Sequence, residues 1–122
     1  MKKIIFLLIT SISIHAFAGN SFNGFIGAGE NHSIALLCDG TVWTWGERAN
    51  GQLGDNTSGL GGDALVPVQV HGIGNVGFLT TITQVAAGKN HCLALRCDGR
   101  VLSWGDNTAG QLGDGTTLQR NV

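Results

Sequence analysis

Apolar residues alternate with small or polar ones along two short segments, 34–45 and 93–104, and an Asp-Gly pair divides each segment. Alternation with a period of two is typical of a β-strand that has one face more deeply buried than the other. An Asp-Gly pair between two such runs is the strongest short-range signal for a β-hairpin, because a type I′ turn needs positive φ at both central residues. We therefore predict two β-hairpins, which turn at Asp39-Gly40 and at Asp98-Gly99.

A two-residue loop fixes the register of each hairpin. In the first hairpin Leu36 then lies opposite Trp43, and Ile34 lies opposite Trp45. These bulky side chains share one face, while small residues such as Ala35 lie on the other. The second hairpin repeats the contrast, with four bulky residues on one face: Leu93, Leu95, Leu102 and Trp104. A bulky face opposite a small-residue face suits stacked sheets, because each bulky face can interdigitate with the small face of its neighbour.

The two hairpins belong to an internal repeat with an offset of 59 residues. Residues 29–57 and 88–116 share 17 identities in 29 positions. Further strands are expected at Val66–Val70 and Leu79–Ala87, which makes about four strands per repeat. Repeated four-stranded units of this period are typical of the blades of a β-propeller. We therefore predict an all-β fold of antiparallel β-propeller blades, with repeat one at about 25–80 and repeat two, truncated, at about 81–122.

Two blades are too few to close a propeller, which takes roughly four to eight. The 104 residues after position 18 make about 1.8 repeats, and the sequence stops at Asn121-Val122, before any counterpart of the strand at Val66-Pro67-Val68. We expect further blades in cis, from a longer product, or in trans, from several chains that assemble into one ring. Of these two arrangements we favour the longer product.

The first 18 residues are predicted to be a signal peptide. Lys2 and Lys3 form a positive n-region, Ile4–Ile14 is largely apolar, and Ala16-Phe17-Ala18 offers small residues where signal peptidase requires them. The apolar run is shorter than the roughly 20 residues of a transmembrane helix, although a retained anchor is the alternative. We expect cleavage after Ala18, a secreted or periplasmic mature chain, and no membrane attachment afterwards.

Composition narrows the classes of function. Charged residues make up 12% of the chain and glycine supplies 20 residues, which suits short strands joined by tight turns. Beyond the signal peptide, five basic residues face eight acidic ones, a net charge of −3, and the basic residues do not cluster. Because nucleic-acid binding depends on clustered Lys and Arg that neutralise phosphates, we do not expect a nucleic-acid partner.

Candidate catalytic and ligand-binding groups are few. His32 and His91 recur beside a glycine, and we expect each to hold a hydrogen bond within its own blade, because no second metal ligand sits at suitable spacing. The three tryptophans are expected in the core. Residues 72–77 match the dinucleotide-binding pattern by letter, but no helix is predicted to follow, so we expect a turn. Residues 106–115 lack the ligand spacing of an EF-hand calcium loop. We predict no metal, no cofactor and no catalysis by this segment.

Three cysteines in an exported chain raise the question of a disulfide. Cys92 and Cys97 lie about 16 Å apart along one predicted strand, well beyond the span of about 7 Å that a disulfide bridges. Cys38 and Cys97 mark the same corner of neighbouring hairpins and remain a candidate pair. A His91-Cys92 catalytic pair is not expected, because adjacent residues of a strand point to opposite faces.

The repeat resembles the regulator of chromosome condensation repeat. The matching positions are Gly29, His32, Ala35, Leu36, Asp39, Gly40, Val42, Trp45, Gly46, Gly51, Gln52, Leu53, Gly54 and Asp55, and, in the second copy, Gly88, His91, Ala94, Leu95, Asp98, Gly99, Val101, Trp104, Gly105, Gly110, Gln111, Leu112, Gly113 and Asp114. The resemblance implies a seven-bladed propeller, of which this chain supplies roughly two blades. Its founding member is a guanine-nucleotide exchange factor for the small GTPase Ran and binds chromatin. Many relatives are protein-interaction platforms, and a secreted β-lactamase inhibitor shares the propeller class. Fold alone does not choose among these activities.

We predict an exported scaffold whose loops at the blade ends contact a protein partner, because loops on rigid frames carry recognition. The candidate partner-binding residues flank the hairpins: Glu47, Arg48, Asn50, Lys89, Asn90, Asp106 and Asn107. Within these loops, Gln52 and Gln111 are expected to satisfy backbone groups. One alternative is a regulator or exchange factor of a small GTPase. Another is a secreted enzyme inhibitor or hydrolase whose active residues lie on blades absent from this segment.

Overall fold

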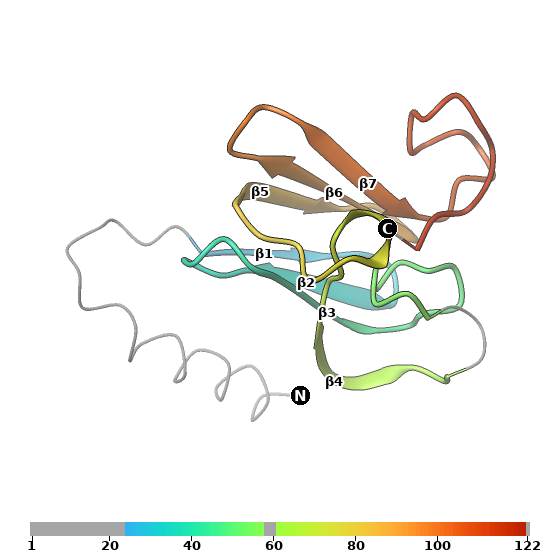
Figure 1. The fold of residues 1–122 in the computed structure, drawn as a ribbon. Helices are drawn as coiled ribbons and strands as arrows, with labels where there is room; N and C mark the ends of the chain where they lie inside the picture. Colours follow the sequence, from blue (N-terminus) through green and yellow to red (C-terminus); the bar gives the residue numbers. More distant parts are fainter. Residues whose placement is uncertain (1–23, 58–60, 122) are drawn as a thin grey trace.

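A computed structural model describes residues 24–57 and 61–121 as two stacked antiparallel sheets (Figure 1). The first sheet has four strands in sequence order: β1 (Phe25–Ala28), β2 (His32–Leu36), β3 (Val42–Gly46) and β4 (Ala64–Gln69). The second has three described strands: β5 (Ile82–Ala87), β6 (His91–Arg96) and β7 (Val101–Gly105). This confirms the predicted all-β fold of antiparallel strands. The predicted signal peptide lies outside the described residues.

The connection between the sheets holds the turn predicted at residues 72–77. The backbone N–H of Gly72 donates to the carbonyl of Gly77 at 3.0 Å, and a short 3-10 helix, η1 (Ile73–Asn75), occupies the turn. His71 and Phe78 form a bridge at its base and stack edge to face, with ring centroids 5.5 Å apart. No helix within the described ranges is long and apolar enough to cross a membrane.

Each hairpin turns through three residues, so the predicted two-residue type I′ turn is wrong. In the first hairpin the N–H of Gly40 donates to the carbonyl of Leu37 at 3.0 Å, and the N–H of Leu37 donates to the carbonyl of Thr41 at 2.9 Å. Only Gly40 of the Asp-Gly pair has positive φ, at 80°. Asp39 instead accepts the N–H of Thr41 at 3.0 Å through its carboxylate. This is a type I turn followed by a left-handed glycine, the common three-residue hairpin loop.

The extra loop residue shifts the register by one and redistributes the side chains between the faces. Ile34 lies opposite Thr44, and Ala35 lies opposite Trp43. The tryptophans of β3 therefore share a face with Ala35 and not with Ile34. Each face combines large residues from one strand with small ones from the next, so the predicted bulky and small faces are wrong. A one-residue slip has this effect because side chains alternate strictly along a strand.

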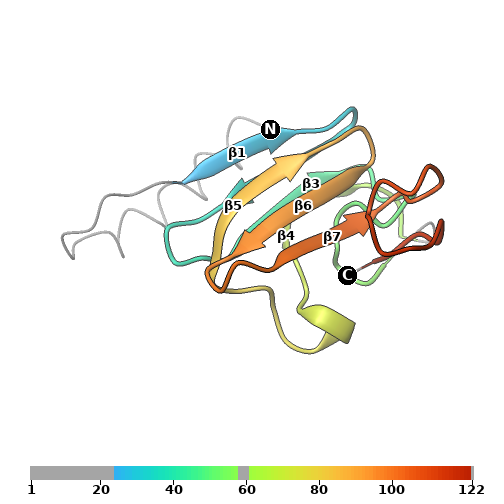
Figure 2. The same ribbon diagram turned by 90° about the horizontal axis from the view of Figure 1, so that it is seen from above.

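The core of the described chain is the contact between the two sheets. Figures 1 and 2 show β5, β6 and β7 lying over the first sheet, with their strands running in broadly similar directions. The buried cluster between the sheets takes residues from one face of each: Ile34, Leu36 and Val42 from the first, and Cys92, Ala94 and Trp104 from the second. Val85, Ala87 and Leu102 pack against this cluster from the second sheet. Apolar burial of this kind is the main stabilising contribution to such a fold.

Candidate protein-binding surface

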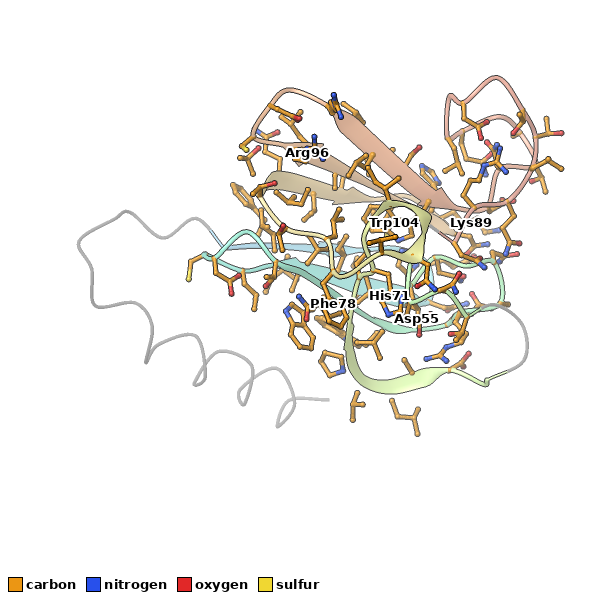
Figure 3. All side chains as sticks on the ribbon, viewed as in Figure 1. Asp55, His71, Phe78, Lys89, Arg96 and Trp104 are labelled. Carbon is orange, nitrogen blue, oxygen red and sulfur yellow. The ribbon has the colours of Figure 1, made fainter. Side chains whose placement is uncertain are left out.

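The loops that were predicted to contact a partner gather at one end of the two sheets, where β2 and β6 begin and β3 and β7 end. We call this the loop end; it comprises residues 29–31, 47–57, 88–90 and 106–119. Figure 3 shows Lys89 and Asp55 toward this end. Backbone hydrogen bonds tie its segments together, from Glu47 N–H to Asn31 (2.8 Å), from Asp106 N–H to Asn90 (2.9 Å) and from Glu30 N–H to Lys89 (3.1 Å). The last of these joins the two sheets.

A glutamine organises each loop after the Trp-Gly pair, as predicted. In the first repeat the side-chain oxygen of Gln52 accepts the N–H of Asn50 at 2.8 Å, and its amide nitrogen donates to Glu47 at 3.2 Å. In the second repeat Gln111 accepts the N–H of Ala109 at 2.9 Å and donates to Asp106 at 2.8 Å. These bonds fix the carboxylates of both loops in place.

Arg48 is held inside its loop. Its guanidinium pairs with Asp55 at 3.1 Å, and the two side chains are only 14% and 10% exposed. A pair this enclosed stabilises the loop more than an exposed ion pair does, because water screens it less. Arg48 therefore offers little of its charge to a partner.

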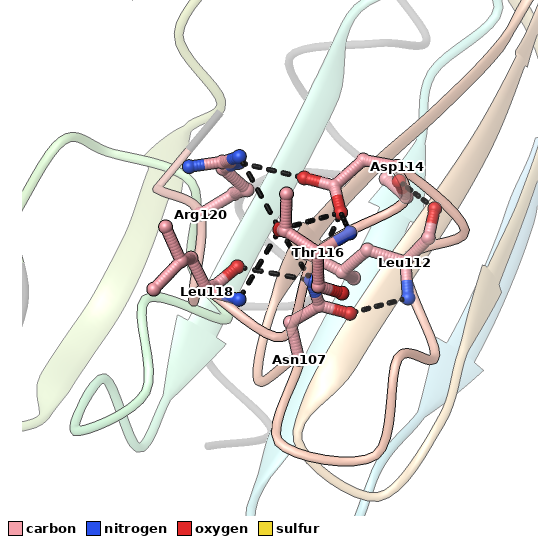
Figure 4. Close-up of polar contacts among 7 residues, drawn as sticks. Asn107, Leu112, Asp114, Thr116, Leu118 and Arg120 are labelled. Atoms are coloured by element: carbon pink, nitrogen blue, oxygen red, sulfur yellow. Dashed lines mark hydrogen bonds and ion pairs between the residues drawn. The ribbon is translucent and has the colours of Figure 1, made fainter.

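Asn107 occupies the repeat position of Arg48, and its side chain is fully buried. Figure 4 shows its polar contacts. Its amide nitrogen donates to the carbonyl of Leu118 at 3.0 Å and to the carboxylate of Asp114 at 3.1 Å. Its side-chain oxygen accepts the N–H of Leu112 at 3.0 Å. Asp114 is the counterpart of Asp55. In each repeat, therefore, the side chain at this position binds the aspartate seven residues further along. The side chain of Asn107 is consequently not available at the surface.

Asp114 is a strong acceptor within this loop. Hydrogen bonds from the hydroxyl and the N–H of Thr116, with a further one from Arg120 at 2.9 Å, lower the pKa of Asp114 to about 2. Hydrogen bonding also lowers the pKa of Asp106, and the bond from the N–H of Thr108 has the largest effect. Both carboxylates therefore stay charged at neutral pH.

The most exposed charges of the loop end come from the short turns before β2 and β6. Lys89 and Glu30 form an ion pair at 3.4 Å, with side chains 71% and 50% exposed. Lys89 was among the predicted candidates, whereas Glu30 was missed. The available signal was the repeat itself, since Glu30 is the counterpart of Lys89. Asn90 is half-buried, and its side-chain oxygen has no hydrogen-bond partner among the described residues.

A histidine–cysteine contact joins the two sheets and was not predicted. The Nε2 atom of His32 lies 3.2 Å from the Sγ atom of Cys92, sixty residues away. The expectation that His32 bonds within its own blade is therefore wrong. The carbonyl of Gln52 completes the contact, because it accepts the Trp104 indole N–H at 3.0 Å and the Cys92 thiol at 3.6 Å.

This contact is structural and not a catalytic dyad. Burial raises the pKa of Cys92 to about 12, so the thiol stays neutral and lacks the thiolate that acts as a nucleophile. Burial, with a smaller effect of nearby His91, lowers the pKa of His32. A neutral pair is what an apolar contact between sheets favours. All three cysteines are free thiols, and Cys38 and Cys97 are exposed.

The comparisons with known proteins agree with this architecture. Two family profiles, both described as "Regulator of chromosome condensation (RCC1) repeat", match the chain, one over residues 25–52 and 82–111 and the other over residues 39–95. Human E3 ubiquitin-protein ligase HERC2 is 41% identical over 91 residues, which are 73% of this chain and 2% of HERC2.

Two solved structures show the same arrangement of sheets. Human WBSCR16 superposes with a TM-score of 0.67 at 30% identity, over 87% of this chain and 25% of that one. Prp20p of Saccharomyces cerevisiae, described with its binding properties to Gsp1p and histones, gives a TM-score of 0.65 at 25% identity, over 86% and 25%. The two sheets thus match part of an RCC1 propeller, and the chain spans about a quarter of these structures and far less of HERC2.

Proposed function

Because the chain belongs to the regulator of chromosome condensation (RCC1) repeat family, we propose that it is a non-enzymatic scaffold that is exported and binds a protein partner through its loop end. The observation that carries the proposal is the anchoring of the loops. Backbone bonds join them across both sheets, and half-buried Arg48 and buried Asn107 brace them from within. Binding to a rigid surface costs little ordering entropy, which favours protein recognition.

The chemistry of the loop end supports recognition by mixed charges. Lys89 and Glu30 present opposite charges side by side, and half-buried Glu47 and Asp106 add acidic groups. Such groups contribute steering and specificity more than raw affinity. The binding properties of Prp20p to Gsp1p and histones, as described for that protein, make a protein partner the first expectation for this chain.

The absence of catalysis is part of the proposal. The described residues hold one buried histidine–cysteine contact, and its thiol is neutral. Export is proposed from the pattern of residues 1–18. The test is the mass of the chain recovered outside the cytoplasm. We expect a mass that corresponds to an N-terminus at Gly19, and an uncleaved chain that stays in the cytoplasm would contradict export.

The binding proposal is tested by affinity capture from the extracytoplasmic fraction with wild type, Lys89→Glu and a charge-swapped Lys89→Glu/Glu30→Lys chain. The amount of a specific partner that is captured should fall at least tenfold with Lys89→Glu. Arg100→Glu is the matched control, because Arg100 is equally exposed, at 70%, and lies by the hairpin tip at the other end. Equal capture by Lys89→Glu and Arg100→Glu would place the partner elsewhere.

A second candidate is regulation of a small GTPase. It is favoured by the likeness to Prp20p, whose described properties include binding to Gsp1p. A nucleotide-release assay with a small GTPase tests it: faster release in the presence of the chain supports the exchange-factor reading, and unchanged release removes it.

A further inference from the structure

The contact between the two sheets is a contact between two copies of one repeat, and each sheet also has an outward face. The first sheet contributes Ile34, Leu36 and Val42 to the contact, and the counterparts of these residues on the second sheet are Leu93, Leu95 and Val101. The second sheet contributes seven residues. The counterpart of Ile82 lies outside the described residues, and the other six have counterparts on the first sheet: Ile26, Ala28, Ser33, Ala35, Trp43 and Trp45. The outward faces therefore carry the two halves of the contact that the structure already makes.

The outward face of the second sheet is exposed where its counterpart is covered. Val42 is 0% exposed, whereas Val101, the same residue type at the same repeat position, is 66% exposed. A groove of about 270 Å³ runs along this face, lined by apolar groups of Leu93, Leu95 and Val101. We call these three residues the second open face.

The outward face of the first sheet is open along β1. Ile26 is 70% exposed, whereas its counterpart Val85 packs against the buried cluster. A cavity of about 410 Å³ lies beside Ala28, Ser33 and Trp45. Strand pairing places Ile26, Ala28 and Ser33 on one face of the sheet, with Trp45. Ala28 is exposed and Ser33 half-buried, whereas Trp45 is only 9% exposed. We call these four residues the first open face.

We propose that the first open face of one chain binds the second open face of another, head to tail, by the contact that joins the two sheets within each chain. This interaction goes beyond the proposed function, because its main contact is between the sheet faces, with Lys89 and Glu30 of the loop end at its rim. It is heterologous, so it continues from chain to chain until a ring closes. Each added chain supplies further blades toward the roughly four to eight with which propellers close.

The polar contacts between the sheets have counterparts that also fit. His32 meets Cys92 within the chain, so His91 of one copy would meet the Ser33 hydroxyl of the next. Trp104 donates to the carbonyl of Gln52, so Trp45 would donate to the carbonyl of Gln111.

The charges agree as well. Glu30 of the first sheet pairs with Lys89 of the second inside one chain. Between chains, Lys89 of one copy would face Glu30 of the next, again with opposite signs. An apolar contact with polar and charged groups matched at its rim is the usual composition of a specific interface.

The test is the mass of the full chain in solution, measured by light scattering over a range of concentrations. Wild type should give a mass at least twice that of one chain. Val101→Glu blocks the second open face and Ile26→Glu blocks the first, and each alone should give the mass of one chain. Mixed together they should form a 1:1 pair, because each variant keeps the face that the other lacks. Val76→Glu is the control: Val76 is 78% exposed, lies outside the sheets, and should assemble as wild type does.

Three results would overturn the proposal. A wild-type chain that stays single at every concentration would show that the open faces await other repeats. Variants that still self-associate would show contact between like faces or at another surface. A mixture that remains unpaired would refute the head-to-tail arrangement. Circular dichroism of each variant confirms that the sheets persist. Partner capture is scored separately with the Val101→Glu and Ile26→Glu chains, so the two proposals can fail independently.

Discussion

Val42 and Val101 provide an internal test of the contact between sheets, because they share a repeat position and differ in burial, at 0% and 66% exposed. Val42→Ala removes two methyl groups from the buried cluster. At about 0.8 kcal/mol for each buried methylene-sized group, plus the cavity left behind, the loss should be about 2 kcal/mol. Val101→Ala removes the same atoms from a largely solvated site, so its loss should be about 0.5 kcal/mol.

Urea unfolding of both variants measures this difference. Both are made in the Ile26→Glu background, so that a single chain unfolds and association does not contribute. The slope of the free energy against urea should be unchanged, since neither substitution alters the surface exposed on unfolding by much. Losses that agree within about 0.5 kcal/mol would refute the reasoning, because the two positions would then have equivalent surroundings and the sheets could not stack as described.

The remaining predictions concern single side chains. Asn107→Ala leaves several loop groups without partners and should cost about 2 kcal/mol, with faster proteolysis within residues 106–119 as the readout; undiminished protection would show that the bonds in Figure 4 do not order the loop. The pKa of His32 is lowered in the folded state, so the folded chain binds a proton at His32 more weakly than the unfolded chain does. Stability should therefore be complete above about pH 6.5 and fall as the pH drops below it, an effect that His32→Gln should reduce. A thiol reagent should modify Cys38 and Cys97 in the native chain and Cys92 only after unfolding, and rapid native labelling of Cys92 would contradict its burial.

The repeat made the fold readable from the sequence, because 17 identities at one offset reveal a structural unit before any strand is assigned. The hairpin turns were located correctly but with the wrong length. An Asp-Gly pair serves both a two-residue and a three-residue loop, and the choice depends on whether the aspartate adopts positive φ. Here Asp39 keeps negative φ and uses its carboxylate to bind the loop backbone. That single difference moved every side chain of β3 to the other face.

The candidate site was predicted at the level of loops and less well at the level of side chains. Strand order alone brings residues 47–50, 89–90 and 106–107 to one end, so their gathering follows from the hairpins. Burial does not follow, because the roles of Arg48 and Asn107 depend on aspartates seven residues further along a folded loop. The His32–Cys92 contact depends on how the sheets stack, which no local pattern encodes.

Ser33 and Cys92 hold a repeat position at which the two copies differ in a polar side chain, and the difference is informative. Cys92 lies fully buried beneath His32, and the residue at the matching position of the first sheet is Ser33, on an open face. A thiol is cheaper to bury than a hydroxyl, since it forms weaker hydrogen bonds with the water that it leaves. The copy that the structure covers therefore carries the sulfur, and the copy at the open face carries the oxygen. Burying a serine costs no stability only where a hydrogen-bond donor or acceptor contacts its hydroxyl. The repeat supplies such groups, because His91 and the Gln111 carbonyl are the counterparts of His32 and the Gln52 carbonyl, which contact Cys92. The difference between the copies is thus compatible with both states of the first open face, solvated in a single chain and covered in a head-to-tail assembly.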